Sequence, residues 1–258
     1  MNSKIVETAK AWSELGSNYA SSEVHKQGPS LFKLLELARA NPNDTCLDIG
    51  TGTGHTAAAL AKTAKYVYGL DPSVGMRQAA TELYSGISNL EFVDGTSENT
   101  NYPNNHFDIV TARHTLHHHP SMPKTLAEIK RVLKPGGRLI IVDEITPNSA
   151  LNDWYHELEI TRDPTHIRSY YLSEWQEFIN SAGLKWIVGD AKTSYQLDIE
   201  KWIMRMKPSP EQANKVRQLF AEASPQAKAI FNIQYKDGLA LSFKIPMAVI
   251  LAVKPETN

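Results

Sequence analysis

Glycine and aspartate residues near position 50 have the types and spacing of a cofactor-binding turn. The segment from Leu47 to Gly54 reads Leu-Asp-Ile-Gly-Thr-Gly-Thr-Gly, which predicts a strand that turns through alternating glycines into a helix. Glycine tolerates positive φ and lets a ligand approach the backbone closely. Asp71 lies 21 positions after Gly50 (71 − 50), at the end of the next apolar run. Because an acidic residue at about this offset typically binds ribose hydroxyls, the pattern predicts a nucleoside-containing cofactor.

The details of the turn indicate which cofactor. A dinucleotide fingerprint spaces its glycines G-x-G-x-x-G, whereas this turn has G-x-G-x-G with Asp48 two residues before the first glycine. A carboxylate there would repel a pyrophosphate but would suit an ammonium group. The Asp-x-Gly-x-Gly-x-Gly pattern resembles motif I of the class I S-adenosylmethionine (SAM) methyltransferases. That cofactor carries a ribose, an adenine, an ammonium, a carboxylate and a sulfonium, and no phosphate.

Composition restricts the class of protein. The chain has 258 residues, of which 41% are hydrophobic and 21% charged, with a formal net charge of −1. These values are ordinary for a globular protein and favour neither nucleic acid nor a membrane surface as partner. The single cysteine, Cys46, excludes an internal disulfide and fits a small core residue. Without a signal-peptide core or an apolar run of membrane-spanning length, we expect a cytoplasmic protein with no membrane span.

The glycine turn belongs to a regular alternation of strand and helix patterns. Such alternation predicts an α/β fold: a doubly wound, Rossmann-like, mostly parallel sheet, with seven strands expected. Strands are expected at Thr45 to Ile49, Tyr66 to Leu70, Leu90 to Val93, Phe107 to Ala112, Arg138 to Val142, Leu184 to Val188 and Ala240 to Val253, with helices at Thr56 to Thr63, Val74 to Tyr84, Met122 to Leu133 and Leu172 to Ala182.

Two segments stand outside this alternation and suggest a division of the chain. Residues 1–43 form an N-terminal helical cover, with helices at Ser3 to Leu15 and Ser30 to Ala40 joined by a polar stretch. Residues 44–197 form the cofactor-binding core, 198–230 a helical insertion, and 231–258 the final strands. Both helical segments are expected to cover the carboxyl ends of the strands, where open α/β sheets bind ligands. The alternative for residues 198–230 is a dimer arm, which would make the protein a homodimer.

The resemblance to class I methyltransferases continues beyond the glycine turn. Phe107-Asp108-Ile109-Val110 is similar to their fourth strand, and the run from Glu128 to Leu139 looks like their Arg-Val-Leu-Lys-Pro-Gly-Gly segment. These motifs match best the subgroup of ubiquinone and menaquinone biosynthesis C-methyltransferases and bacterial proteins of the YcgJ type. Arg162 to Arg168 and Leu172 to Trp175 resemble the YcgJ branch. The resemblance implies a SAM-dependent methyltransferase that acts on a small molecule and releases S-adenosylhomocysteine.

The resemblance also implies the residues that bind the cofactor. Relatives often carry an aspartate that reads the adenine amine at the position of Thr96, so a hydroxyl, the neighbouring Asp94 or backbone amides take that role here. Arg113 and His114 are assigned to the methionine end. The expected cofactor-binding residues are Asp48, Gly50, Thr51, Gly52, Gly54, Asp71, Pro72, Met76, Asp94, Gly95, Thr96, Ser97, Arg113 and His114.

Polar side chains that could serve the methyl acceptor gather in two later segments. The run Arg113 to His119 follows the fourth strand, and Arg162 to Tyr171 follows the fifth. Histidine is the usual base where an acceptor must lose a proton, and arginine is suited to an anionic or phenolic oxygen. The alternative is that both segments are solvated loops. Candidate catalytic residues are His117 and His166, and candidate acceptor-binding residues are His118, Asp143, Arg162, Arg168 and Tyr170; Tyr19 and His25 are candidates to close over the cofactor.

We expect no metal, since three adjacent histidines cannot converge on one ion. Two other functions remain open from sequence. One is an NAD(P)-dependent Rossmann oxidoreductase, and the other is a SAM-binding protein without methylating activity. Within the methyltransferases, quinone-ring carbon, phenolic oxygen, carboxylate and amine acceptors all remain candidates.

Overall fold

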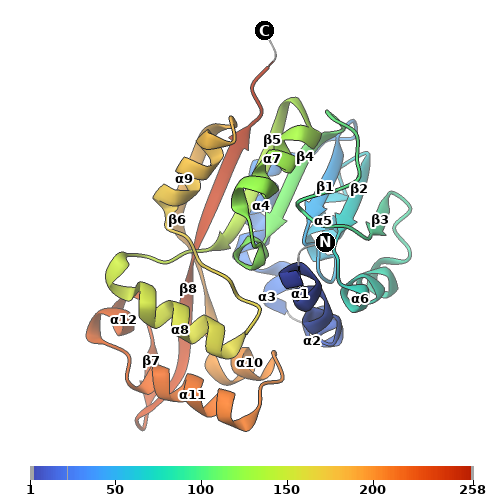
Figure 1. Ribbon diagram of the computed structural model, residues 1–258. Coiled ribbons are helices and arrows are strands. Elements are labelled where there is room, and N and C mark those ends of the chain that lie inside the picture. Colours follow the sequence, from blue (N-terminus) through green and yellow to red (C-terminus); the bar gives the residue numbers. More distant parts are fainter. Residues whose placement is uncertain (1–2, 22, 257–258) are drawn as a thin grey trace.

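The computed structural model describes residues 3–21 and 23–256, and it contains one central mixed sheet (Figure 1). The strand order is β3-β2-β1-β4-β5-β8-β6, with β7 paired to β8. Strands β1 to β5 are parallel, while β8 runs antiparallel to both β5 and β6. The expected α/β, mostly parallel sheet is therefore confirmed. The strands are β1 (Thr45–Ile49), β2 (Tyr66–Leu70), β3 (Leu90–Val93), β4 (Phe107–Arg113), β5 (Leu133–Glu144), β6 (Lys185–Asp198), β7 (Gln234–Lys236) and β8 (Leu239–Val253).

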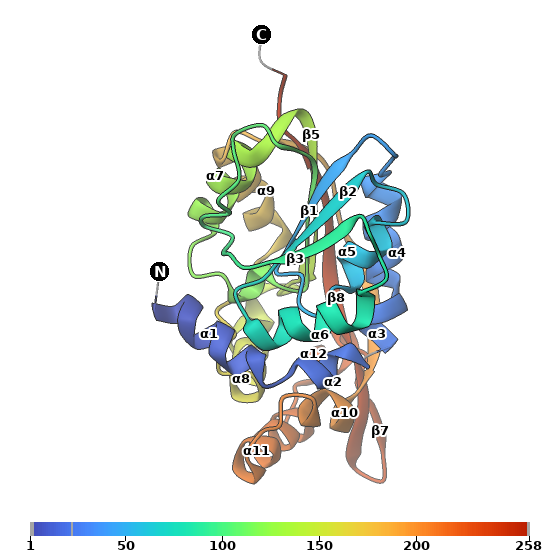
Figure 2. The same ribbon diagram turned by 90° about the vertical axis from the view of Figure 1, so that its right-hand side faces the viewer.

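Helices cover both faces of this sheet, as a buried parallel sheet requires. In Figure 2, α7 (Met122–Val132) and α9 (Leu172–Ser181) lie on one side, and α4 (Pro29–Ala38) and α5 (His55–Leu60) lie on the other. The two sides have separate apolar cores, one containing Leu126 and Ile179 and the other containing Leu34. Helix α6 (Val74–Tyr84) packs against β3 at the sheet edge.

The N-terminal segment differs from the expectation of two helices joined by a polar stretch. Between α1 (Ser3–Ser13) and α4, the chain forms two further short helices, α2 (Gly16–Ala20) and α3 (Glu23–Gln27); Ser22 lies outside the described residues. Isolated helices this short are unstable in water, so packing must hold them. Gly16 supplies that packing, because a Cβ at this position would lie 2.8 Å from the carbonyl oxygen of Gly75 in α6.

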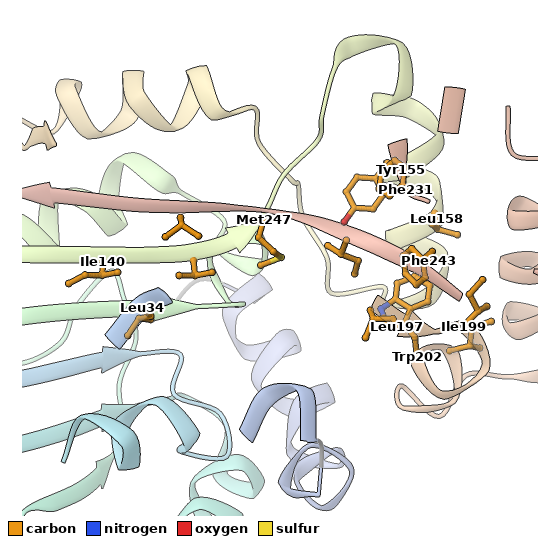
Figure 3. Close-up of a cluster of buried hydrophobic side chains, with 14 of the residues drawn as sticks. Leu34, Ile140, Tyr155, Leu158, Leu197, Ile199, Trp202, Phe231, Phe243 and Met247 are labelled. Carbon is orange, nitrogen blue, oxygen red and sulfur yellow. The ribbon is translucent and has the colours of Figure 1, made fainter. Parts of the chain in front are cut away.

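The two longest strands carry a second packed region beyond the sheet. We expected only Leu184 to Val188 as the sixth strand, whereas β6 continues to Asp198 and pairs along β8. The extension was missed because its residues are largely polar and half exposed. Figure 3 shows Trp202, Phe231 and Phe243 packed together around this end of β8. The helices of this region are α8 (Asn152–Arg162), α10 (Ile199–Met204), α11 (Pro210–Ala221) and α12 (Pro225–Ile230).

The sheet sets the position of the functional residues. Strands β1, β2, β3 and β4 end at one common edge, since they are parallel and in register. The Thr51 N–H donates to the carbonyl oxygen of Leu70 (3.0 Å), which ties the glycine turn to the end of β2. Loops that follow several strands therefore meet at this edge. None of the helices in the described part of the chain is long and apolar enough to span a membrane.

Candidate functional site

A pocket with an empty volume of about 1040 Å³, partly open to solvent, lies at the carboxyl ends of these strands. Helix α1 lies across this end of the sheet (Figure 2). The wall is built from the strand ends and the loops that follow them: residues 50–53 after β1, 70–73 at the end of β2, 95–97 after β3, and 113–115 and 118–120 at and after the end of β4. Other residues of the wall include Trp12, Tyr19, His25, His55 and Met76.

The glycine turn uses its glycines in different ways. Gly50 and Gly52 have φ values of +59° and +54°, a region that favours glycine. A Cβ on Gly50 would overlap the side chain of Thr115, so Gly50 allows the turn to pack against the loop after β4. A Cβ on Gly52 would meet no atom within 4 Å. The backbone at Gly52 therefore borders open space where a ligand can approach.

Asp71 connects the ends of β1 and β2 at the pocket wall. The Gly52 N–H donates to Asp71 Oδ2 and the Ser73 N–H donates to Asp71 Oδ1, each at 2.8 Å. Each carboxylate oxygen can accept a further hydrogen bond. Burial raises the pKa of Asp71 to about 6. The carboxylate is thus fixed in orientation and suited to a pair of ribose hydroxyls.

Asp48 has a different position from the one we expected. It lies beneath the turn and outside the pocket wall, with Oδ2 accepting from the Thr51 hydroxyl and Oδ1 from the Thr111 hydroxyl, both at 2.7 Å. Burial raises its pKa to about 6. The expected contact between Asp48 and an ammonium group stays a prediction, and the structure places this carboxylate behind the wall, where it holds the turn through Thr51. Gly54 is also outside the wall; it precedes α5 and packs against Phe92.

Arg113 and His114 join the end of β4 to the surrounding helices and line the pocket. Arg113 donates to Thr56 Oγ1 (2.8 Å), to Ser30 Oγ (3.2 Å) and to the carbonyl oxygen of His25 (2.6 Å). His114, at φ +55°, bonds to Ser30 Oγ through Nε2 (3.0 Å). Burial, followed by the charge of Arg113, lowers the pKa of His114 to about 3. The wall here therefore pairs a cationic guanidinium with a neutral imidazole, which suits a carboxylate ligand.

The loop after β3 forms another part of the wall. Gly95, Thr96 and Ser97 line the pocket, and the Ser97 hydroxyl bonds to Nδ1 of His119 (2.9 Å). Asp94 is not in the wall. Its side chain is 66% exposed and pairs with Arg77 at 2.7 Å, so the alternative that Asp94 binds adenine is corrected.

Trp12 and Tyr19 close the pocket from the N-terminal helices. Their rings lie 4.9 Å apart, and the Trp12 ring contacts that of His118 at 5.1 Å. Trp12 Nε1 donates to Thr165 Oγ1 (3.0 Å), which ties α1 to the loop after α8. We expected Tyr19 and His25 here but missed Trp12. The sequence signal for Trp12 is a tryptophan in a helix that is otherwise mostly polar. In the structure no residue of this helix is buried.

His118 is the expected acceptor-side residue that lies in the pocket wall. The Thr165 hydroxyl donates its one proton to Asp163 Oδ1 (2.6 Å), so it cannot also donate to His118. The proton shared between Thr165 and His118 therefore comes from the imidazole. Nδ1 of His118 therefore donates to the carbonyl oxygen of Thr165 (3.1 Å), and Nε2 holds the lone pair. Asp163 Oδ2 lies 3.7 Å from Nε2, close enough to stabilise a positive charge formed there. His119 also lines the pocket and was not among the predicted site residues.

His117, Asp143 and His166 lie behind the wall. Nδ1 of His117 donates to Asp143 Oδ1 at 2.6 Å. Burial acts to lower the pKa of His117, but the charges of Asp143 and Glu144 outweigh it and raise this pKa to about 10. His166 contacts Glu144 at 3.4 Å, and burial lowers the pKa of His166 well below its usual value. We therefore correct the prediction that His117 or His166 is a base at the pocket, since His117 is protonated and neither residue reaches the wall.

Arg162, Arg168 and Tyr170 do not form the expected acceptor clamp. Arg162 donates to the carbonyl oxygen of Trp202 (3.1 Å) and to Tyr19 Oη (3.2 Å), so it supports the cover. Arg168 pairs with Glu174 (2.8 Å), and Tyr170 packs against aromatic rings of α9. No described residue of 198–230 lines the pocket, contrary to our expectation; that segment reaches the site through Met206, which contacts Tyr19 Oη at 3.4 Å.

Comparison with known proteins gives a consistent family. Residues 47–141 match a family model described as a methyltransferase domain. The chain is 30% identical over 240 residues to the uncharacterized methyltransferase YcgJ of Bacillus subtilis, covering 92% of this chain and 94% of that protein. It is also 30% identical over 191 residues to a demethylmenaquinone methyltransferase of Symbiobacterium thermophilum, covering 70% and 68% of the two chains.

Solved structures agree with these sequence matches. The crystal structure of Bacillus subtilis YcgJ superposes with a TM-score of 0.83 and 29% identity, covering 90% of this chain and all of that one. A geranyl diphosphate methyltransferase in complex with SAM superposes with a TM-score of 0.57 over 87% of this chain and 84% of that one. At 16% identity, this second likeness shows a shared fold alone.

Proposed function

The chain belongs to the class I methyltransferases of the YcgJ type, and from this premise we propose that it transfers a methyl group from SAM to a small-molecule acceptor. The observation that carries the proposal is Asp71. Its buried carboxylate lies in the pocket wall, is oriented by two backbone N–H groups, and stands beside the open backbone of Gly52. This arrangement fits the ribose of a nucleoside-containing cofactor, since the oriented carboxylate can accept from a pair of hydroxyls.

The three parts of the cofactor would be held by different loops. Asp71 would accept hydrogen bonds from the ribose hydroxyls, while Met76 and the loop from Gly95 to Ser97 border the adenine. Arg113 and the glycine turn would hold the methionine carboxylate and ammonium. The SAM complex of a geranyl diphosphate methyltransferase supports this assignment at the level of the shared fold.

Methyl transfer is an in-line displacement that requires alignment and exclusion of water. Positioning of this kind can supply about 7–11 kcal/mol of the barrier. Trp12 and Tyr19, which come from the N-terminal helices, would exclude water from the pocket, and His118 would face the acceptor. If the acceptor loses a proton, His118 Nε2 would take it, with the Thr165 carbonyl fixing the tautomer and Asp163 stabilising the imidazolium.

Two measurements test this function. Calorimetry should show that purified protein binds SAM and S-adenosylhomocysteine and does not bind NAD. Binding of NAD in place of SAM would support an oxidoreductase instead. Incubation with methyl-labelled SAM and candidate acceptors should then transfer label to a small molecule. Demethylated quinols are the first class to try, because one relative is a demethylmenaquinone methyltransferase. SAM binding without label transfer to any acceptor class would favour the non-methylating alternative.

The proposal also includes the setting in which the enzyme works. With a net charge of −1, nucleic acid is not expected as a partner or acceptor. We further propose a cytoplasmic enzyme, as the composition suggested. Equilibrium sedimentation will show whether the chain forms a homodimer.

A further inference from the structure

A compact group of potential metal ligands lies behind the pocket wall, in a place that the proposed methyl transfer does not use. His117, Glu144 and His166 each present one ligand atom, and these atoms lie within 4.8 Å of one another. They come from the turn η1 (Leu116–His118), from the last residue of β5, and from the loop between α8 and α9. Two ligands bonded to one tetrahedral zinc ion at about 2.0–2.2 Å stand about 3.3–3.6 Å apart, so side-chain rotations that move the ligand atoms by about 1 Å would close the group around an ion.

Asp143 orients the first of these ligands. Its carboxylate accepts from Nδ1–H of His117 and from the backbone N–H groups of Leu116 (2.7 Å) and Glu144 (2.9 Å). With Nδ1 engaged in this way, Nε2 of His117 is the nitrogen that would bind a metal, releasing its proton as the ion binds. A carboxylate that binds the far nitrogen of a metal-bound histidine is a common outer-shell arrangement, because it fixes the ring orientation and the tautomer.

One ligand of the group carries a buried polar atom that has no hydrogen-bond partner among the described residues. This atom is Nε2 of His166. The His166 side chain is 1% exposed. Unsatisfied buried polar atoms are rare and require an explanation, and binding of an ion is one.

Buried acidic side chains also surround the group. Four carboxylates are buried around the group, those of Asp143, Glu144, Glu159 and Asp163. Arg162 is the buried arginine beside them, at 3.9 Å from Glu159. Buried carboxylates are costly unless they are paired or bind a metal.

We propose that His117, Glu144 and His166 bind a divalent transition-metal ion of the zinc class, with Asp143 orienting His117. Imidazole ligands favour zinc, iron, nickel or copper over magnesium and calcium, which prefer oxygen. Three protein ligands leave at least one coordination position open. The site would replace our expectation of a metal-free protein, which rested on the poor convergence of the adjacent histidines and on the absence of metal-ligand spacing elsewhere in the sequence. Binding at this site does not depend on the proposed methyl transfer.

Metal titration tests the site directly. Tag-free protein, dialysed against a chelator, is titrated calorimetrically with zinc chloride and, separately, with magnesium chloride. We expect one zinc ion per chain and no magnesium binding. Glu144→Gln and His166→Asn should each weaken zinc binding at least tenfold, and Asp143→Asn about 10- to 100-fold. The matched control is His106→Asn, because His106 stacks on Tyr102 away from the group. This control should bind zinc like the wild type.

Several outcomes would overturn the site. One is that the wild-type protein binds no zinc. Another is that neither Glu144→Gln nor His166→Asn weakens zinc binding tenfold. The third is that His106→Asn weakens zinc binding as much as these two variants do. Circular dichroism and SAM calorimetry check that each variant is folded. If the variants do not fold, cobalt(II) added to the wild type gives the deciding measurement. Visible d–d bands of a four- or five-coordinate ion, displaced by zinc, would support the site, and their absence would overturn it.

Discussion

The two sides of the η1 turn contain the same kinds of side chain in opposite electrostatic states. On the pocket side, burial lowers the pKa of His118 to about 4, so the ring is neutral. On the other side lie His117, Asp143, Glu144 and His166, which we call the cluster. Here the nearby carboxylates raise the pKa of His117 to about 10 against the effect of burial. The two rings are only 4.1 Å apart. The pKa values of the adjacent histidines thus differ because His117 bonds to Asp143 and lies near Glu144, whereas at His118 burial and the charge of His117 outweigh Asp163.

The difference indicates separate tasks for the two regions. Asp71 and His118 in the pocket wall have lone pairs that a ligand can use. Asp143 in the cluster accepts from the His117 imidazole and from the backbone N–H groups of Leu116, His117 and Glu144. Its carboxylate is therefore fully engaged. We therefore expect changes in the pocket to affect binding and turnover, and changes in the cluster to affect stability. Four variants or conditions test this division.

The largest expected effect is that of His118→Asn on turnover. If the acceptor loses a proton, kcat should fall about 10²- to 10⁴-fold, because the variant lacks the proposed base. SAM affinity should change only a few-fold. Single-turnover transfer of labelled methyl, together with calorimetry, separates the two quantities. His119→Asn is the matched control and should affect the loop of Ser97 and cofactor binding more than kcat. A wild-type kcat in His118→Asn would exclude His118 as the base.

Asp143→Asn should have the largest effect on stability. It leaves the buried imidazolium of His117 without its partner, and breaking a buried pair typically costs about 3–5 kcal/mol of unfolding free energy. Urea denaturation measures this loss. The control is Glu157→Gln, which removes the half-exposed partner of Lys215. It should lower the free energy of unfolding by about 0–1 kcal/mol. A loss of SAM affinity in folded Asp143→Asn, with unchanged stability, would contradict the division of tasks.

Asp71→Ala should weaken SAM binding by about 1.5–3 kcal/mol, which is roughly 10- to 150-fold. The reason is that the ribose hydroxyls lose a charged, buried acceptor. Calorimetry at neutral pH provides the measurement. Asp94→Ala is the control, since its exposed carboxylate pairs with Arg77 outside the wall. Equal affinities for wild type and Asp71→Ala would show that the ribose does not bind here.

The smallest expected effect is on the pH dependence of SAM binding. Burial raises the pKa of Asp71 to about 6 in the free protein, and the ionised carboxylate is the form that accepts from two hydroxyls. Affinity should therefore be constant above about pH 7 and fall as the pH drops through 6, reaching a roughly tenfold loss near pH 5. Calorimetry between these values tests the sign. In Asp71→Asn the dependence should largely disappear; a rise in wild-type affinity toward acid would contradict the assignment.

Much of the fold and half of the site could be predicted from sequence because the signals are local. The glycine turn, the acidic end of β2 and the alternation of strands and helices each depend on residues close together in the chain. Given that alternation, topology brings the loops after β1 to β4 to one edge. For this reason Gly50, Gly52, Asp71, Thr96 and Arg113 were predicted at the pocket and lie in its wall.

Only the tertiary structure decided which polar side chains face the ligand. Asp48 is turned beneath the glycine turn by the hydroxyls of Thr51 and Thr111, and Trp12 covers a pocket whose wall comes mostly from residues later in the chain. His117 and His118 are adjacent, yet the turn directs their rings to different regions. Glu144 and His166 meet His117 from positions 27 and 49 residues further along the chain (144 − 117 and 166 − 117). Such convergence depends on the packing of the loop between α8 and α9 against the sheet end, and no local spacing in the sequence encodes it.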